Sequence, residues 1–418
     1  MFDEYKGIPQ EARLLVYLSF PPGLAVGFIY TDLSYFLPEV QGLAIFWTGV
    51  TITLMGVTVA AAAIPLGMLA DRYGRLRMLV LGNLCAGFSL LGFALTSSLP
   101  LILLTAVVEG LGEASFAVSF SALLANRAGD EKRTSAFSLA ALLSWISAAI
   151  GAASISSIAL IQGLGLSIGQ AHVALFVVVA LFSLSITPLL LRLKETKTYG
   201  GGGRPVLPRK SAKVIKRYAA YSLLIALGAG LFVPLMTLWF KSAYGVPDTV
   251  SGLVLGLSSI LTAVAVVLAP RLAKRLGHVK AIAVTQALSM VFMVGVPLSP
   301  NFPIAGSLYT VRVFLMNLSN PLGQSLLMGL VAPEERGTAA GVTAGLWRLP
   351  NSLSVSVGAT LMADGYLSLP FYMATVLYAV AITAFWLLFR NARLPEEIDA
   401  FPQLPAQSSS FDSSEEAR

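Results

Sequence analysis

Residues 67–77 read Gly-Met-Leu-Ala-Asp-Arg-Tyr-Gly-Arg-Leu-Arg, a short basic segment between two long apolar ones, residues 42–66 and 78–97. An α-helix needs about 20 apolar residues to cross a ~30 Å hydrocarbon core, and both flanking segments reach that length. The basic segment is therefore expected to be a loop between two membrane-spanning helices.

Apolar segments of this kind recur along most of the 418 residues. Hydrophobic residues make up 56% of the chain and charged residues only 12%, whereas a soluble protein averages about 25% charged residues. Lipid cannot satisfy open backbone groups, and the alternating pattern of a membrane β-barrel is absent, so the segments are expected to be helices. The twelve expected spans are residues 14–37, 42–66, 78–97, 99–125, 136–161, 169–191, 218–240, 250–270, 281–299, 303–330, 338–363 and 367–389.

One long polar interruption, residues 192–217, divides the spans into two sets of six. It contains four consecutive glycines, two prolines and many basic residues, a composition typical of a flexible linker. The tail is rich in Ser, Pro, Glu and Asp, which indicates disorder. We therefore expect a cytosolic N-terminus (1–13), a first half (14–191), a cytosolic linker (192–217), a second half (218–390) and a disordered cytosolic tail (391–418).

The two halves carry a repeat at an offset of 203 residues. Two separate loops agree on this offset, which indicates a parallel duplication about an axis along the membrane normal. The matching residues are Leu69, Ala70, Arg72 and Gly74 with Leu272, Ala273, Arg275 and Gly277, and Glu131, Arg133 and Ala136 with Glu334, Arg336 and Ala339.

The distribution of positive charge predicts the orientation in the membrane. If both termini are cytosolic, 25 of the 28 Lys and Arg residues fall on the cytosolic side, and the outer loops hold only Lys241. This asymmetry follows the positive-inside rule. The net charge of +7 is thus an orientation signal, and no nucleic-acid partner is expected. We predict a multi-pass protein of the plasma membrane with cytoplasmic termini, functional as a monomer in the lipid bilayer.

The loop at residues 67–77 resembles the signature loop of the major facilitator superfamily, GxLaDrxGrkxxl, at nearly every position. The twelve spans, the central linker, the repeat and the PEERG-like loop at 333–337 fit that family as well. The resemblance covers about residues 12–390 and implies a secondary transporter with a substrate site at mid-membrane between two rocking halves. Ala106 stands where drug–proton antiporters of the family usually carry Arg, which weakens an assignment to that subgroup.

The resemblance also implies a conformational latch in the loops, which stabilises the outward-facing state. Gly67 would permit close helix approach, Gly74 a tight reversal, and Asp71 an interaction with a helix N-terminus or a neighbouring Arg. The second copy has Pro270 and Lys274 at the equivalents of Gly67 and Asp71, so its latch is expected to be weak. The candidate latch residues are Gly67, Asp71, Arg72, Gly74, Arg75, Glu131, Arg133, Glu334 and Arg336.

Five ionisable residues lie inside the spans, where they are costly and indicate function by default: Asp32, Glu109, Glu113, Arg312 and Arg348. Glu109 and Glu113 are four residues apart and share a helix face. Two carboxylates in a low dielectric are not easily both ionised, so one of them is a candidate for proton coupling. Arg312 would be their partner or a substrate anchor. The alternative is a structural Glu–Arg pair without transport chemistry.

Asp32 is a third proton-coupling candidate, or else a residue of the outer mouth. Arg348 is expected to be structural, because span eleven usually packs behind the cavity helices of the family. The family's cavity helices are spans one, four, seven and ten, which carry further polar or aromatic residues. The candidate substrate-binding residues are therefore Arg312, Asn317, Asn320, Gln324 and Trp239.

Motifs for other classes of function are missing. The chain has no GxxxxGK[ST] loop, and its two histidines, His172 and His278, are far apart, so we expect no cofactor, no metal site and no enzyme. The GxSxG string at 165–169 lacks the α/β sheet that a nucleophile elbow needs. A receptor would need a sensor domain, and a lipid-modifying enzyme would need a catalytic cluster, for which Ser167 and His172 are the nearest approach.

The expected function is secondary active transport of a small organic solute by alternating access. Proton coupling is favoured over sodium or no coupling ion, and export is slightly favoured over proton-driven uptake of a sugar or carboxylate.

Overall fold

The computed structural model describes residues 7–193, 195, 211–332 and 335–392, and regular structure within them is helical. The first half contains α1 (Gln10–Leu18), α2 (Phe20–Tyr35), the π-helix η2 (Phe36–Val40), α3 (Ile45–Tyr73), α4 (Arg75–Leu95), α5 (Leu99–Ser154), α6 (Ser157–Gln162), α7 (Ile168–Leu184) and α8 (Thr187–Leu191). The second contains α9 (Ala212–Gly230), the 3₁₀ helix η3 (Val233–Leu235), α10 (Met236–Tyr244), α11 (Asp248–Leu276), α12 (His278–Gly295), α13 (Phe302–Leu330), α14 (Arg336–Ala363) and α15 (Leu369–Phe389).

The helices agree with the expected membrane spans. In the described residues, ten stretches are long and apolar enough to cross a membrane. Two further helices, α13 and α14, are 29 and 28 residues long, as long as the other spans, and contain the intramembrane residues Arg312 and Arg348. Together these stretches form the two six-helix sets of the predicted all-α membrane fold. The segment expected to be linker up to residue 217 is already helical from Ala212.

Several of the spans depart from a single continuous helix. The first breaks at Ser19, just before Pro21 and Pro22, because proline lacks the N–H that an inner helical turn needs. The seventh breaks around Pro234 in η3. Spans four and five run together as α5, with a kink at Gly129 (φ 68°) between them. These breaks place helix ends inside or beside the bundle, where they can act as hinges.

The internal repeat is visible in the helix boundaries. Helices α3 and α11 are both 29 residues long and begin 203 residues apart. Each ends at a glycine with positive φ, Gly74 (φ 110°) and Gly277 (φ 77°), and the next helix starts immediately afterwards. The duplication inferred from two loops therefore extends to the backbone of whole helices.

Gly74 makes the tight reversal that its sequence context predicted. Its φ of 110° lies in a region that side-chain-bearing residues rarely adopt, and an added Cβ would lie 2.8 Å from Oε2 of Glu195. That carboxylate accepts the backbone N–H of Leu76 at 3.1 Å, so it caps the first turn of α4.

We expect Gly74→Ala to destabilise the protein by about 1–3 kcal/mol, the usual cost of a strained backbone conformation. The measurement is the Tm of the purified protein in detergent. Gly67→Ala is the control, because Gly67 lies two turns earlier, within α3, and an added Cβ there meets nothing within 4 Å. Equal Tm values for the two variants would contradict the interpretation.

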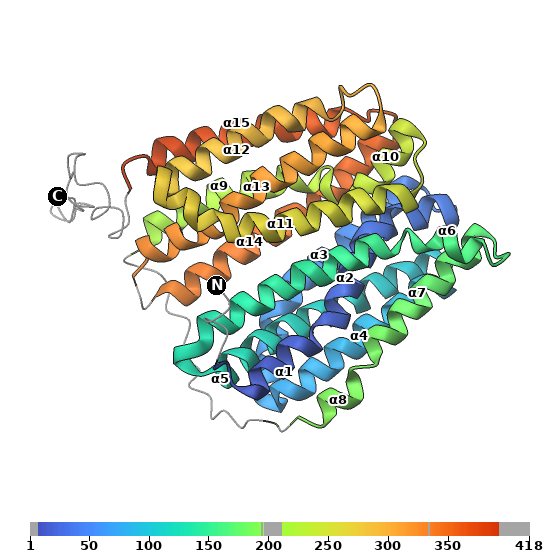
Figure 1. The fold of residues 1–418 in the computed structure, drawn as a ribbon, viewed down its shortest axis with the longest axis horizontal. Helices are drawn as coiled ribbons and strands as arrows, with labels where there is room; N and C mark the ends of the chain where they lie inside the picture. The colour runs from blue at the N-terminus through green and yellow to red at the C-terminus, as the bar shows by residue number, and fades with distance from the viewer. Residues whose placement is uncertain (1–6, 194, 196–210, 333–334, 393–418) are drawn as a thin grey trace.

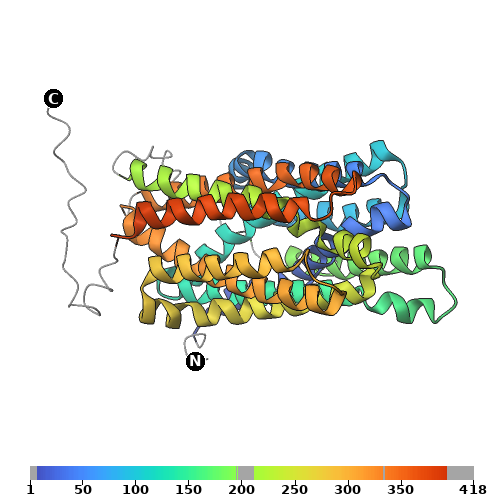
Figure 2. The ribbon, with the colours of Figure 1, turned by 90° about the horizontal axis from the view of Figure 1, so that it is seen from above.

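The two halves form two bodies that meet at one end (Figure 1). The second half (yellow-green to red) lies above the first (blue to green), and their helices run along the long axis of the molecule (Figure 2). Leu193 and Ser211 flank the central segment between the halves. We call the end of the molecule at which they lie the linker end, and the opposite end the far end. The halves diverge toward the linker end and approach each other at the far end, where α10 lies beside the first half (Figure 1).

Small and hydroxylated residues join the halves in the part of the bundle nearer the far end. Gly252 and Gly256 of α11 pack on the end of α5: an added Cβ would lie 2.8 Å from the carbonyl oxygen of Ala152 and 3.0 Å from that of Ala149. Three hydroxyls donate to backbone carbonyls across the interface, namely Thr53 to Ser352 (2.8 Å), Ser156 to Thr249 (2.6 Å) and Thr237 to Thr31 (2.6 Å).

Candidate functional site between the two halves

An ion pair connects the halves near the middle of the bundle. Arg348, near the middle of α14, donates from Nη2 to Oε1 and Oε2 of Glu113 on α5, at 2.7 and 2.8 Å. Tyr30 of α2 completes the cluster: its hydroxyl donates to Oε2 of Glu113 at 2.7 Å and accepts from Nη2 of Arg348 at 2.7 Å. The Arg348 guanidinium also lies 5.8 Å from the centre of the Tyr30 ring.

This cluster is only partly shielded from solvent. The side chains of Glu113 and Arg348 are 19% and 27% exposed. A charge pair taken out of water is stable only when its remaining lone pairs and protons are satisfied, and Tyr30 meets that need here. A proton on Glu113, or a charged solute beside Arg348, would weaken the pair. The cluster can therefore couple the chemistry of a bound species to the separation of the halves.

Glu109 is separated from this cluster although it lies one turn away on the same helix. It is 2% exposed and accepts a hydrogen bond from the Ser89 hydroxyl of α4. Its bond therefore stays within the first half, whereas Glu113 is bonded to the second. The role of Glu109 in coupling stays a prediction.

Arg312 does not pair with the acids that the sequence suggested. Its Nη2 donates to the Tyr378 hydroxyl at 2.8 Å, and its guanidinium lies 4.9 Å from the centre of the Phe232 ring. It is 4% exposed, and within the described residues it forms no ion pair and its Nε has no hydrogen-bond partner. Of the two roles expected for Arg312, that of partner to the acids is not seen here: Glu113 pairs with Arg348, because α14 lies against the first half. The role of Arg312 as a substrate anchor stays a prediction.

A second polar cluster lies in the far-end part of the interface. His172 of α7 contacts Oδ2 of Asp248, the first residue of α11, through Nε2 at 2.7 Å. Oδ1 of Asp32, on α2, lies 3.8 Å from the same nitrogen. All three side chains are fully buried. Asp32 is thus brought together with two residues that sequence reasoning did not group with it.

The remaining substrate candidates differ in exposure. Asn320 and Gln324 are exposed on α13. Asn317 is half-buried and accepts from the Asn320 amide at 2.8 Å. Trp239 is 2% exposed and donates from Nε1 to the carbonyl of Leu367 at 2.9 Å, so in this conformation it belongs to the packing of the second half. Substrate contact by these residues stays a prediction.

The charged latch residues whose side chains the structure describes contact each other or a neighbour in the first half. Arg75 donates to Oδ1 of Asp71 at 2.8 Å, and the Asp71 side chain is 59% exposed. Arg72 is exposed, and its guanidinium lies 5.4 Å from the Tyr73 ring. The close approach expected at Gly67 is not present here, since an added Cβ would meet nothing within 4 Å. Glu334 and the side chains of Glu131, Arg133 and Arg336 lie outside the described residues.

Sequence reasoning missed Tyr30, His172, Asp248 and the partner of Arg348. A general signal for Arg348 existed, because a lone Arg inside a span requires an acid partner, and few acids lie inside the spans. His172 carried the same kind of signal, because a histidine inside a span is also costly, whereas Tyr30 and Asp248 carried none. Their partners are distant in sequence and lie on other helices.

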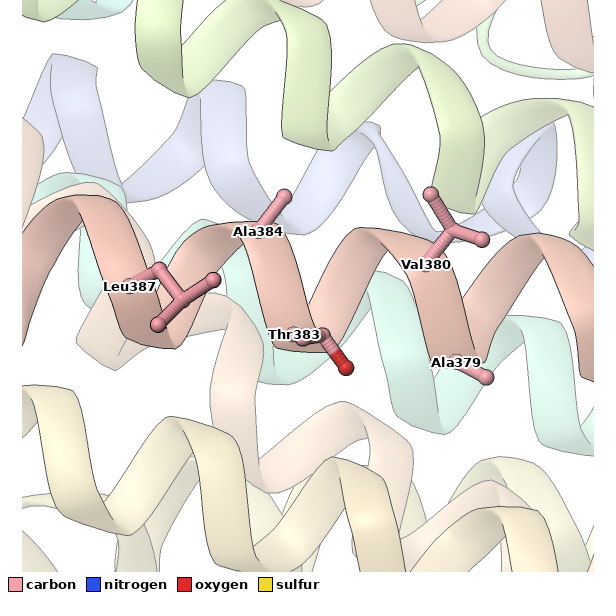
Figure 3. Close-up of a pocket in the computed structure, with 5 residues that line it drawn as sticks. All are labelled: Ala379, Val380, Thr383, Ala384 and Leu387. Carbon is pink, nitrogen blue, oxygen red and sulfur yellow. The ribbon is translucent and has the colours of Figure 1, made fainter.

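An apolar groove lies on the surface of α15, lined by Ala379, Val380, Thr383, Ala384 and Leu387 (Figure 3). Val380 and Leu387 are 53% and 59% exposed. The lining residues follow one helix face, and no charged side chain lines the groove. A solute site needs convergent polar groups to orient its ligand, so we do not assign this groove to transport.

Comparisons with known proteins agree with this architecture. The family model described as Major Facilitator Superfamily matches residues 19–355 and 218–413. No curated protein sequence matches the chain. The crystal structure of a mutant of the nucleoside transporter NupG is similar, with a TM-score of 0.74 and 15% identity over 90% of this chain and 99% of that one. So is that of a bacterial homolog to the human lysosomal transporter Spinster, in an inward-facing and occupied conformation, with a TM-score of 0.73 and 14% identity over 91% and 97%.

Proposed function

Because the chain belongs to the Major Facilitator Superfamily, we propose that it is a secondary active transporter that moves a small organic solute across the cell membrane by alternating access. The observation that carries the proposal is the Glu113–Arg348–Tyr30 cluster, which joins the two halves at mid-depth and remains partly exposed. Solute and coupling-ion sites of secondary transporters lie near the midplane at the interface of their repeats.

The conformation described here corresponds to one end state of that cycle. The halves are joined toward the far end, whereas Asp71 at the linker end is exposed. The basic residues concentrate in the loops at the linker end, so we place this end, with both termini, in the cytoplasm. The conformation is then inward-facing, a state in which an exposed Asp71 is expected.

The polar residues of α13 support an aqueous path between the halves. An amide exposed on a membrane span would lose its hydrogen bonds in lipid. Asn320 and Gln324 are exposed at such positions. We therefore infer that they face water in the path between the halves. Amides on one helix and a carboxylate–guanidinium pair on two others suit a polar or amphiphilic organic solute.

Coupling to protons is the part of the proposal that rests on the carboxylates. Protonation of Glu113 would remove the negative charge that holds Arg348 and would free the halves to move. A proton gradient could drive export or uptake through the same step. We favour export, with proton-driven uptake of a sugar or carboxylate as the alternative. The proposal makes the protein a transporter in the plasma membrane that works as a monomer.

The test is counterflow in proteoliposomes against a library of radiolabelled solutes, with and without a pH gradient. We expect at least one small organic solute to exchange faster than in protein-free liposomes, and an imposed pH gradient to drive its net movement. The sign of the gradient that drives accumulation distinguishes export from uptake. Failure to exchange any solute under all gradients, with protein that is folded by its thermal transition, would contradict the transport function.

A further inference from the structure

The buried cluster at the far end has the composition of a metal site. It contains one imidazole nitrogen and two carboxylates, from Asp32, His172 and Asp248, and one ligand atom from each residue lies within 4.8 Å of the others. The three residues lie on α2, α7 and α11, so two come from the first half and one from the second. The ion-pair cluster of Glu113 and Arg348 does not include them.

The strongest sign of a missing partner is the carboxylate of Asp32. The side chain is fully inaccessible to solvent, and neither of its carboxylate oxygens has a hydrogen-bond partner. A buried carboxylate whose oxygens accept no hydrogen bond is destabilising unless cations lie close to it. Oδ1 is directed at the His172–Asp248 pair, 3.8 Å from Nε2 of the imidazole. A cation bound between the three groups would satisfy it.

Hydrogen bonds from the surrounding backbone hold His172 and Asp248 in the orientation that metal ligands need. Nδ1 of His172 lies 2.8 Å from the carbonyl oxygen of Ile168, to which it can donate, and Nε2 then faces the two carboxylates. Oδ1 of Asp248 accepts the backbone N–H of Thr249 at 2.8 Å, which leaves Oδ2 for the site. Such outer hydrogen bonds fix the tautomer and orientation of ligating histidines and carboxylates.

The geometry and charge suit a divalent ion. Tetrahedral ligands about 2.0 Å from Zn²⁺ lie roughly 3.3 Å apart. The distances from Nε2 of His172, 2.7 Å to Asp248 and 3.8 Å to Asp32, lie on either side of that value, so small side-chain movements suffice. A neutral imidazole with two carboxylates carries two negative charges, which one divalent ion neutralises inside the protein.

We propose that Asp32, His172 and Asp248 form a binding site for a divalent first-row transition-metal ion of the Zn²⁺ type, which bridges the two halves. A mixed nitrogen and oxygen ligand set favours such an ion over Mg²⁺ or Ca²⁺, which prefer oxygen ligands alone. Because Asp248 belongs to the second half and the other two ligands to the first, the bound ion holds the far end closed.

The test measures Zn²⁺ binding to the purified full-length protein after treatment with a chelator. The background variant carries Cys85→Ser and His278→Gln, because these residues are the only cysteine and the only other histidine of the chain. We expect one equivalent of Zn²⁺ to bind, in competition with a chromophoric chelator. We also expect Zn²⁺ at saturation to raise the Tm by about 2–5 °C, because a ligand stabilises the state that binds it.

Asp32→Asn, His172→Gln and Asp248→Asn in this background are each expected to weaken Zn²⁺ binding by at least about a hundredfold. Loss with Asp248→Asn also shows that the second half contributes a ligand. Mg²⁺ in place of Zn²⁺ is expected to leave the Tm unchanged. Absence of saturable Zn²⁺ binding in the folded background variant would overturn the proposal, and so would binding that survives all three substitutions.

A second measurement keeps the test decisive if a variant fails to fold. Co²⁺ bound to the background variant should give the visible absorption bands of a four-coordinate site, without a thiolate charge-transfer band. The expected ligands are one imidazole, two carboxylates and water. Octahedral Co²⁺ spectra identical to those of the free ion would overturn the proposal. The binding measurements do not depend on transport, so their failure and the failure of the proposed function are distinguishable.

Discussion

Glu113→Gln and Arg348→Ala are each expected to lower the rate of solute counterflow by roughly 5- to 150-fold, which corresponds to about 1–3 kcal/mol. Breaking a fully buried ion pair costs about 3–5 kcal/mol, because the remaining charge is left without a partner in a low dielectric. The smaller value is appropriate here, since the two side chains are 19% and 27% exposed. Loss of the pair also removes a connection between the halves at mid-depth.

The controls separate this effect from a general effect of charge. Lys241 and Glu39 form another ion pair between the halves, at 3.7 Å, but their side chains are 32% and 36% exposed. Exposed pairs contribute little, typically about 0–1 kcal/mol. Lys241→Gln and Glu39→Gln are therefore expected to change counterflow by less than about fivefold. Equal losses in the exposed pair and in the Glu113–Arg348 pair would show that the midplane cluster has no special role.

The pH dependence of transport tests the coupling role of the two carboxylates. If Glu113 carries the coupling proton, Glu113→Gln abolishes accumulation driven by a pH gradient and makes the residual counterflow independent of pH. Glu109→Gln is the matched comparison, because Glu109 lies one turn away and is bonded to Ser89 within the first half. If both variants kept the wild-type rate and pH profile, proton coupling through this helix would be excluded.

Gly252→Ala is expected to shift the molecule away from the conformation described here by roughly 5- to 150-fold. The added Cβ would lie 2.8 Å from the carbonyl oxygen of Ala152 and 3.2 Å from Cβ of Ile155. The first atom belongs to the backbone of a packed helix, which cannot move as a side-chain tip can. Overpacking of this kind typically costs about 1–3 kcal/mol. Opening the far end relieves the clash.

The shift can be measured through thiol labelling. In the Cys85→Ser background, Ser156→Cys places a thiol at the far-end interface, where the native hydroxyl donates to the carbonyl of Thr249. Gly252→Ala should increase its rate of reaction with a water-soluble maleimide. Gly345→Ala is the matched control, because it is also a helical glycine and its added Cβ meets nothing within 4 Å. Equal labelling rates in the two variants would contradict the assigned closure at the far end.

Most of the fold could be predicted because it depends on local properties of the chain. A backbone in lipid must satisfy its own hydrogen bonds, so span length and hydropathy determine that helices form and approximately where. The 203-residue offset holds in the starts of α3 and α11. The linker boundary was less accurate, since α9 begins at Ala212 although basic residues follow. Lys and Arg can lie within a helix at the membrane surface and extend their charged ends to water.

The candidate site could be predicted only in part, because helical periodicity specifies a face but not the helix that it meets. Glu113 was identified as a charged residue inside a span, with Arg312 expected either as its partner or as a substrate anchor. Packing instead places Arg348 against it, 235 residues away in sequence, and Arg312 against Tyr378. An isolated charge in a span requires a partner of opposite charge, but the sequence contains several candidates and does not say which of them it meets.

The sequence by itself determined the membrane-spanning all-α architecture, the duplicated halves, and the presence of charges that need partners inside the bilayer. These follow from the energetics of a backbone and of single charges in lipid, which act over one or two turns of helix. The tertiary structure alone decided which charges meet, which end of the bundle is closed, and that Asp32, His172 and Asp248 converge at one point. Such contacts depend on the rotation and tilt of helices, and these are set by packing among residues that are far apart in the chain.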